Sequence, residues 1–332
     1  MAKGLLNGIS PSRPLLLPIV FSLGAKVENV PLGTFLQNPT KISSSLRQMR
    51  AYLRSDCATC YFDPCLEIEA LGATLQRTSD DQAPTIHWPQ TAPVGELPQG
   101  LRSPEEAAKS GRVPVAVEVI RRMNSLPQRD FLLMAGVTGP LTLAARITQM
   151  ENKEKLPSED LSDAAMELAA STVTQVASAF LEAGADLIFI QEEILPVLSD
   201  KSCDSWANLL APTINVVRFY EALPVLQIVH AGTVRENCDA ILQRQWDCVI
   251  CLPLDVAAAR RSTGALKTNP PALGIALPLE TFRQAESGGE DLRQILQPPI
   301  EELRPAIITT AGDVPATTDM KRLAEVLRLE GK

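Results

Sequence analysis

The sequence predicts a single (β/α)8 barrel, in which eight parallel strands alternate with helices. Short apolar runs rich in β-forming residues recur along the chain, and segments with helical spacing lie between several of them. The runs show little polar alternation, as expected for parallel strands covered on both faces. An open doubly wound sheet is the alternative. The expected strands are residues 15–22, 57–63, 131–137, 187–191, 225–230, 248–252, 273–277 and 306–310.

The clearest helix lies between the third and fourth expected strands. Apolar and small residues recur three or four positions apart from Leu161 to Phe180. Ser158 is the expected N-cap and Gly184 the expected stop. Another helix is expected within VTGPLTLAARI at 137–147, where a Gly-Pro pair separates it from the strand before it.

The second and third strands are separated by a long insertion at 64–129. It begins with a helical segment, DPCLEIEALG, and continues through a proline-rich stretch at 77–104. Because long ordered insertions commonly serve as lids or binding loops, we expect an excursion over the barrel mouth. A passive surface loop is the alternative. The whole chain, 1–332, is expected to form one domain.

Composition excludes several classes of protein. With 45% hydrophobic and 21% charged residues, the chain has the balance of a globular protein. Its 31 Lys and Arg against 39 Asp and Glu give a net charge of −8, which argues against nucleic acid or a membrane surface as a partner. No apolar run is long enough to span a membrane, and no signal-peptide pattern is found. We therefore expect a cytoplasmic location.

The seven cysteines are expected to be free and buried. Two CxxC pairs, Cys57/Cys60 and Cys248/Cys251, lie in predicted strands. Residues three apart in a strand point to opposite faces, so the two sulfurs of a pair cannot share a metal ion or a disulfide.

Candidate functional residues follow the predicted strands. The chemistry of a (β/α)8 barrel gathers at the carboxyl ends of the strands, because the loops there converge. The polar or glycine positions expected to take part are Asp63, Thr138, Gly139, Glu192, Glu193, His230 and Asp313.

Each of these candidates has a structural alternative. His230 is one of two histidines and could bind a metal or act as a general base, or it could be a core-edge residue bonded to backbone. Glu192 and Glu193 are adjacent, so at most one should face the barrel axis, where it could bind a cation or an amine; both could instead be solvated loop acids.

Two further candidates involve helix starts. Asp63 could bind a ligand or cap the next helix. The helix start at Gly139 could offer free N–H groups to an anionic ligand edge. No nucleotide-binding or serine-hydrolase motif occurs in a supporting context, which disfavours those two chemistries.

Several segments together resemble the uroporphyrinogen decarboxylase superfamily. They are Arg13–Pro14, Asp63 followed by EIEALGA (67–73), VTGPLTLAARI (137–147), LEAGADLIFIQE (181–192), VHAG (229–232) and AGDVPATTDMKRLAEVL (311–327). The resemblance spans most of the chain and is closest to the corrinoid-dependent methyltransferase branch. That branch moves methyl groups between corrinoid proteins and thiols such as coenzyme M. The resemblance also implies a (β/α)8 barrel.

The resemblance fails at the metal ligands of that branch. It implies zinc held by a His-x-Cys after the fifth strand and a Cys after the eighth. His230 matches the histidine, whereas Gly232 and Gly312 stand at the cysteine positions. Because a tetrahedral zinc site needs about three protein ligands, zinc is not expected here.

The decarboxylase branch is a weaker match. The resemblance implies an arginine-rich loop after the first strand for an anionic tetrapyrrole, but SLGAKVENVPLG carries Lys26 as its only cation. Asp63 occupies the region of the pyrrole-binding aspartate of that branch.

The leading hypothesis is a methyltransferase that moves a methyl group between a small methylated substrate and a corrinoid protein. The corrinoid would be carried by that partner, and no metal ligand is assigned. His230, Glu192 and Asp63 are the expected catalytic residues. The expected substrate-binding residues are Glu193, Thr138, Gly139 and Asp313. The alternatives are a tetrapyrrole decarboxylase and a non-catalytic barrel that binds a corrinoid or a tetrapyrrole.

Overall fold

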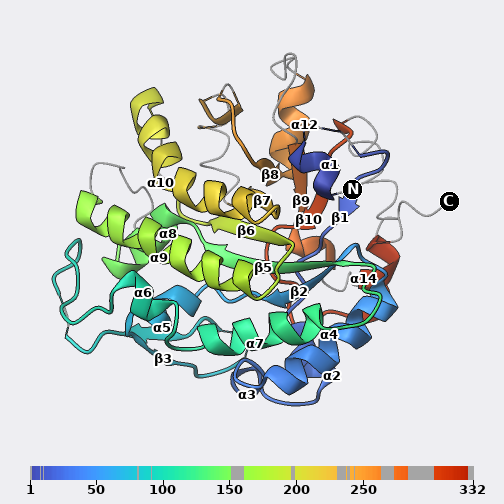
Figure 1. Ribbon diagram of the computed structural model, residues 1–332, viewed down its shortest axis with the longest axis horizontal. Coiled ribbons are helices and arrows are strands. Elements are labelled where there is room, and N and C mark those ends of the chain that lie inside the picture. The colour runs from blue at the N-terminus through green and yellow to red at the C-terminus, as the bar shows by residue number, and fades with distance from the viewer. Residues whose placement is uncertain are drawn as a thin grey trace.

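Eight parallel strands form a nearly closed barrel with helices outside it (Figure 1). This computed structural model describes residues 2–7, 9, 11–80, 82–90, 92–150, 161–195, 199–229, 237, 240–242, 244–262, 273–282 and 303–327. The strand order is β1-β10-β9-β8-β7-β6-β5-β2. The predicted barrel is confirmed. The strands are β1 Leu15–Leu16, β2 Cys57–Tyr61, β5 Leu132–Thr138, β6 Leu187–Glu192, β7 Leu223–Ile228, β8 Val249–Pro253, β9 Leu273–Leu277 and β10 Ile307–Thr310.

The longer helices cover the outside of the sheet. Contacts join α4 and α7 to β2, α9 to β5, and α10 to β7 (Figure 1). Both faces of the strands are therefore buried, which is why the expected runs lack polar alternation. The helices are α1 Ala2–Leu6, α2 Leu23–Val27, α3 Leu32–Phe35, α4 Pro39–Leu53, α5 Leu66–Leu71, α6 Pro104–Ala107, α7 Val113–Asn124, α8 Pro140–Ile147, α9 Asp163–Glu182, α10 Asp200–Phe219, α12 Leu254–Ser262 and α14 Met320–Leu327, with a 3-10 turn, η2, at Leu279–Phe282.

The first strand is much shorter than the predicted 15–22. The N–H groups of Leu15 and Leu17 donate to carbonyls on the β10 side at 2.9 Å, so the N–H group that Pro18 lacks lies on the β2 side, where it leaves the ladder without a donor. Beyond it, the Ile19 N–H donates to the side-chain Oγ1 of Thr310 at 3.0 Å instead of to a backbone carbonyl. Side-chain hydrogen bonds thus replace the ladder after Pro18.

The seam between β1 and β2 is also closed mainly by side chains. The Leu16 N–H donates to Oδ2 of Asp56 at 2.8 Å, and the Asp56 N–H donates to the Leu16 carbonyl at 3.0 Å. Both terminal nitrogens of Arg13 donate to the Asp56 carboxylate at 2.7 Å. Further along, Thr59 Oγ1 accepts from the Val20 N–H at 3.3 Å. Asp56 is the main link across this seam.

Helix α9 begins at Asp163, four residues after the start that a Ser158 cap implies. Ser162 is the N-cap, and its side chain accepts from the Ala165 N–H at 3.3 Å. Ser158 lies outside the described residues. The predicted stop is confirmed, because the helix ends at Glu182 and Gly184 has a φ of +104°.

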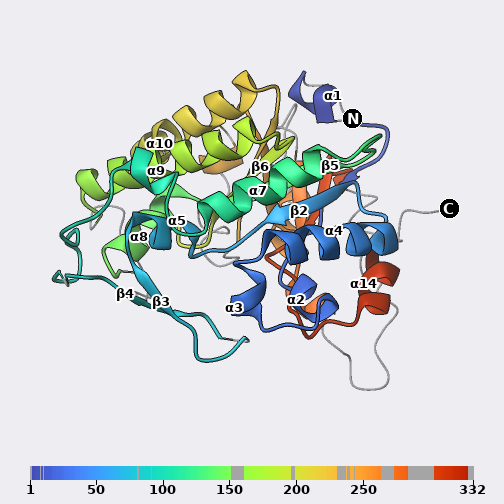
Figure 2. The ribbon, with the colours of Figure 1, turned by 60° about the horizontal axis from the view of Figure 1, so that its bottom comes forward.

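The insertion at 64–129 holds α5, α6, α7 and an antiparallel hairpin of β3 Thr74–Gln76 and β4 Thr85–His87. The hairpin lies apart from the barrel sheet (Figure 2). Asp80 accepts a hydrogen bond from the Leu32 N–H at 2.9 Å, and the Gly95 N–H donates to the Thr148 carbonyl at 2.9 Å. A groove of about 570 Å³ opens between 31–38 and 77–80. That the insertion covers the barrel mouth stays a prediction.

The cysteines that the structure describes are free and buried, as expected. Burial raises the pKa of Cys65 and Cys248 to about 12, and that of Cys57 well above its ordinary value. These thiols therefore remain protonated at neutral pH. Cys238 lies outside the described residues. Among the described helices, none has the length and apolarity needed to cross a membrane.

The Asp56→Asn substitution should destabilise the barrel by about 1–3 kcal/mol at pH 7, because it leaves the partners of a charged acceptor incompletely paired. Although burial opposes ionisation, the hydrogen bonds from Arg13 and Leu16 lower the pKa of Asp56. The stabilisation is therefore complete above the unfolded-state pKa and lost as the pH falls through the folded-state pKa. Urea unfolding of both proteins across acidic pH should show the difference shrinking. Asp130→Asn is the control, since that carboxylate is 80% exposed; an equal loss there would count against the seam.

Candidate functional site

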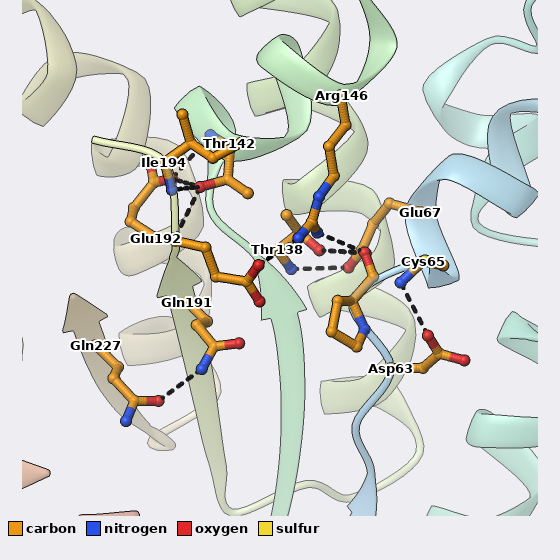
Figure 3. Close-up of polar contacts among 12 residues, drawn as sticks. Asp63, Cys65, Glu67, Thr138, Thr142, Arg146, Gln191, Glu192, Ile194 and Gln227 are labelled. Atoms are coloured by element: carbon orange, nitrogen blue, oxygen red, sulfur yellow. Dashed lines mark hydrogen bonds and ion pairs between the residues drawn. The ribbon is translucent and has the colours of Figure 1, made fainter. Parts of the chain in front are cut away.

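Polar side chains meet at the carboxyl ends of β2, β5 and β6 (Figure 3). They come from the loop after β2, from the ends of β5 and β6, and from α5 and α8. We call this set the mouth cluster: Asp63, Glu67, Thr138, Thr142, Arg146, Glu192 and Glu193. Five of the seven candidates from the sequence are described in this region, counting Gly139, which begins α8.

Glu192 is fully buried and accepts four hydrogen bonds. Oε1 accepts from the Leu141 N–H at 3.1 Å and from the Trp206 indole at 3.0 Å. Oε2 accepts from the N–H and the hydroxyl of Thr142 at 2.9 and 2.6 Å. Burial raises the pKa of Glu192, whereas these hydrogen bonds favour its charged form.

The carboxylate of Glu192 thus occupies the N-terminus of α8, a position that favours negative charge. The sequence analysis expected the N–H groups of this helix start to be free for an anionic ligand. In the structure, the Leu141 and Thr142 amides already donate to Glu192. Gly139 has a steric reason to be glycine, because an added Cβ would lie 2.2 Å from Cδ of Glu192.

Glu193 points away from this buried position. Its side chain is 31% exposed and forms an ion pair with Nη2 of Arg146. The expectation that the two adjacent glutamates project differently is therefore confirmed. The backbone N–H groups of Glu193 and Ile194 donate to Thr142 Oγ1 at 2.9 and 3.0 Å, which fixes the start of the loop after β6 on α8.

Arg146 links two loops and was not identified from the sequence. Besides the pair with Glu193, its Nη1 donates to the Pro64 carbonyl at 2.7 Å. Its side chain is only 10% exposed. One sequence pattern could have identified Arg146: it follows Thr142 by four residues, so both lie on the same face of a helix that starts at a strand end.

Glu67 is a second residue that sequence reasoning missed. It lies in the first turn of α5 and is fully buried. Oε1 accepts from the Thr138 N–H at 3.1 Å, and Oε2 accepts from the Thr138 hydroxyl at 2.9 Å (Figure 3). Burial raises the pKa of Glu67 to about 7. An acid within a run that is otherwise apolar, four residues after a strand-end aspartate, was the signal.

Asp63 lies two residues before Cys65, the N-cap of α5, and its ligand-binding role stays a prediction. Oδ1 accepts from the Cys65 N–H at 2.9 Å, next to the start of α5, and so supports that helix start. The other oxygen pairs with Arg112, which also donates to Oε2 of Glu69 at 2.5 Å. Arg112 belongs to the insertion, so the pair fixes the insertion to the loop after β2.

Asp313 ties the loop after β10 to the loop after β1. It accepts from the N–H groups of Phe21 and Ser22 at 2.7 and 2.8 Å and from the Ser22 hydroxyl. Burial raises the pKa of Asp313 to about 6. Among the described residues its hydrogen bonds are with this pair, and the negative charge of Asp63 in the mouth cluster also raises its pKa.

His230 and Gly232 lie outside the described residues, so the role of His230 stays a prediction. Inside the barrel, amides connect strands across its axis. Gln191 donates to Gln227 at 3.1 Å, and Gln227 donates to the Thr310 carbonyl at 2.6 Å (Figure 3). In the described ranges, no group of three or more His, Cys, Asp or Glu side chains is arranged to hold a metal ion.

Comparison with known proteins places the chain in a family. The model of the family described as uroporphyrinogen decarboxylase (URO-D) matches residues 6–237. The chain belongs to the URO-D family. Within it, the chain is 24% identical over 190 residues to a methylcobamide:CoM methyltransferase, MtaA, from Methanosarcina barkeri, covering 55% of this chain and 53% of that protein. It is 27% identical over 139 residues to a methylated-thiol–coenzyme M methyltransferase from Methanosarcina mazei, covering 41% and 36%.

The chain therefore spans about half the length of the first of these curated relatives. Solved structures support the fold over a greater length. A methyltransferase from Methanosarcina mazei matches with a TM-score of 0.76 and 16% identity, covering 98% of this chain and 96% of that one. A B12-independent methionine synthase from Shewanella sp. W3-18-1 matches with a TM-score of 0.55 and 12% identity, covering 90% and 87%. At these identities the likeness shows the barrel fold alone.

The Gly139→Ala substitution should destabilise the protein by about 1–3 kcal/mol, because its new methyl group would collide with a buried carboxyl held by four donors. Gly312→Ala is the matched control, since an added Cβ there meets only Leu279 Cδ1, at 3.6 Å. Thermal melts of the two variants should show a lowered transition for Gly139→Ala alone. Equal melting points would mean that Glu192 moves aside at little cost.

Proposed function

We propose that this protein is a methyltransferase that moves a methyl group between a small methylated substrate and a corrinoid protein. The observation that carries the proposal is the match over 190 residues to a relative named for methyl transfer from a methylcobamide. Family membership supports it, as does the gathering of polar groups at the carboxyl ends of the barrel strands. The direction of transfer is left open.

The geometry divides the expected site residues into two groups. We assign the substrate contact to Glu193, which is partly exposed, and to Thr138, which ends β5 and is 5% exposed. Glu192 and Asp63 have buried partners, so in this proposal they hold α8 and the insertion in place and act on catalysis indirectly. His230 remains the proposed acid, base or ligand-binding group. Gly139 and Asp313 would shape the loops around them.

A corrinoid carried by the partner protein would supply the cobalt that takes or gives the methyl group. In this scheme the chain's own residues bind and orient the small substrate at the mouth. The partly exposed Glu193 carboxylate, fixed by Arg146, presents negative charge there. The hydroxyl of Thr138 supplies a hydrogen bond whose direction depends on Glu67.

The zinc of the methyltransferase branch does not fit the residues present. Gly312 offers no side-chain ligand at one cysteine position, and Gly232 offers none at the other. Both oxygens of the neighbouring Asp313 already accept hydrogen bonds from Phe21 and Ser22. We therefore assign no step to zinc, and a thiol that needs a zinc ion to ionise is a poor candidate for the substrate.

Tetrapyrrole decarboxylation is the second candidate in the same family, and the mouth geometry favours it less. Lys26 is the only cation of the segment SLGAKVENVPLG. Its Nζ donates to the Thr318 carbonyl oxygen at 3.4 Å. Both oxygens of Asp63 already accept hydrogen bonds, one from Arg112 and one from the Cys65 N–H, so a pyrrole N–H would have to compete with these donors. A non-catalytic barrel that binds a corrinoid or tetrapyrrole is the third candidate, and the assay below separates all three.

The purified protein should demethylate methylcobalamin in the presence of a suitable methyl acceptor, which the change in its visible spectrum reports. Panels of thiols, amines and alcohols supply the acceptor, and uroporphyrinogen and coproporphyrinogen test decarboxylation in parallel. Glu193→Gln should reduce the demethylation rate at least tenfold, whereas the exposed Glu182→Gln should leave it unchanged. Decarboxylation without demethylation would replace the proposal by the second candidate. Corrinoid binding with no turnover would favour the third.

Elemental analysis of the purified protein should find well below one zinc ion per chain, because glycines stand at two ligand positions. His230→Ala should lower demethylation or corrinoid binding while leaving the melting point nearly unchanged. Near-stoichiometric zinc that is lost in His230→Ala would overturn the zinc assignment. A clearly lower melting point with unchanged binding would make His230 a structural residue.

A further inference from the structure

The Thr138 hydroxyl has two acceptors within reach but only one proton to donate. Oγ1 lies 2.9 Å from Oε2 of Glu67 and 3.3 Å from the Pro64 carbonyl oxygen. A threonine hydroxyl has one donor and two acceptor lone pairs, so it cannot donate to both oxygens at once. Which of the two oxygens accepts the hydroxyl proton depends on the charge of Glu67.

When Glu67 is ionised, its carboxylate can only accept, and the shorter, charge-assisted contact takes the hydroxyl proton. The free lone pair of Thr138 Oγ1 is then an acceptor. When Glu67 is protonated, its own O–H can donate to Thr138 Oγ1. The hydroxyl proton is then released toward Pro64 or toward a ligand. Oε1 accepts from the Thr138 N–H in either state, which keeps the carboxyl in place.

We propose that Glu67 is a positioning residue whose protonation decides whether the Thr138 hydroxyl presents a hydrogen-bond donor or an acceptor at the barrel mouth. This inference rests on the proposed methyl transfer and deepens it. In the protonated state the site favours a substrate atom with an available lone pair, such as the heteroatom of an ether, thioether or neutral amine. In the ionised state it favours a donor, such as an ammonium or hydroxyl group.

The surroundings of Glu67 make both states accessible near neutral pH. Burial raises the pKa to about 7, against hydrogen bonds from Thr138 and the positive charge of Arg146, which lower it. Arg146 also forms an ion pair with Glu193. The other buried cation nearby, Arg112 at the start of α7, pairs with Asp63 and Glu69.

The remaining ionisable groups on neighbouring elements leave this balance in place. Glu192 is held by α8 and α10, and the Cys65 thiol has a pKa of about 12. The acids of α6 and the first turns of α9 are exposed to solvent: Glu105, Glu106, Asp163 and Glu167. The buried Glu192, whose pKa burial also raises, is the neighbouring carboxyl closest in environment to Glu67.

Infrared titration of the full-length protein tests the proton itself, without a substrate. Acidification should produce a protonated-carboxyl band with a component whose midpoint lies near pH 7, and Glu67→Gln should remove that component. The component from the buried Asp313, whose pKa is about 6, should remain in both proteins. Thr138→Val should move the midpoint up by about one to two pH units, because the ionised form loses a hydrogen bond. Thr138→Ser keeps the hydroxyl and should keep the midpoint. The exposed Glu182→Gln is the control that should leave the band unchanged.

The pH profile of KM in methylcobalamin demethylation then tests the switch. The native protein and Thr138→Ser should show a change in KM centred near pH 7. Glu67→Gln donates permanently to Thr138 Oγ1 through its amide, so its KM should equal the low-pH value at every pH. Thr138→Val should lose the dependence as well.

The two readouts fail in different ways. A component near pH 7 that Glu67→Gln does not remove, or a KM profile that the variant leaves unchanged, overturns the inference and leaves the methyl-transfer proposal standing. Absence of demethylation by the native protein overturns the proposed function, and the infrared titration still decides whether Glu67 exchanges a proton near pH 7.

Discussion

The arrangement of the barrel mouth depends on one buried carboxylate, that of Glu192. It ends β6 and accepts both leading N–H groups of α8 together with the Trp206 indole of α10. Burying a carboxylate costs free energy unless it is hydrogen-bonded. The first N–H groups of a helix have no partner within the helix, so they can donate to the carboxylate without breaking other hydrogen bonds. Gly139 is the geometric condition for this contact, since any side chain there would occupy the space of the carboxyl. Strand β6 and helices α8 and α10 are therefore joined at one point.

The position of α8 then sets the position of the residues around the mouth. Thr142 and Arg146 lie one helical turn apart, so both face the loop after β6. Thr142 Oγ1 accepts a hydrogen bond from the backbone N–H of Glu193 in that loop, and Arg146 forms an ion pair with the Glu193 side chain. Because Arg146 also donates to the Pro64 carbonyl, the loop after β2 is held by the same helix. A lysine could not make both contacts in this way, since it lacks the planar fork of donors.

Much of the fold could be predicted from the sequence, because fully buried parallel strands appear as unbroken apolar runs. Each of the eight expected runs overlaps a strand of the barrel. The exception in length is β1, where the Thr310 hydroxyl replaces a backbone carbonyl as the acceptor of the Ile19 N–H. Strand-end positions also identified Asp63, Thr138, Glu192 and Glu193. Glu67 and Arg146 were missed because both lie within helices. Their roles come from hydrogen bonds to residues distant in the sequence, Thr138 and Pro64, which no local sequence pattern indicates.

The same contacts explain why a polar residue at a strand end is insufficient evidence for a catalytic role. Glu192 and Glu193 are neighbours of the same type, yet the first is enclosed by four donors and the second is partly exposed. Strand β6 ends at Glu192, and the N-terminus of α8 encloses that carboxylate, whereas Glu193 begins the loop and pairs with Arg146. An acid whose lone pairs are all directed at buried donors stabilises structure, whereas an acid with open lone pairs and a fixed cationic partner can meet a ligand. By this criterion Glu193 is the acid of the mouth cluster that fits the proposed contact with a substrate.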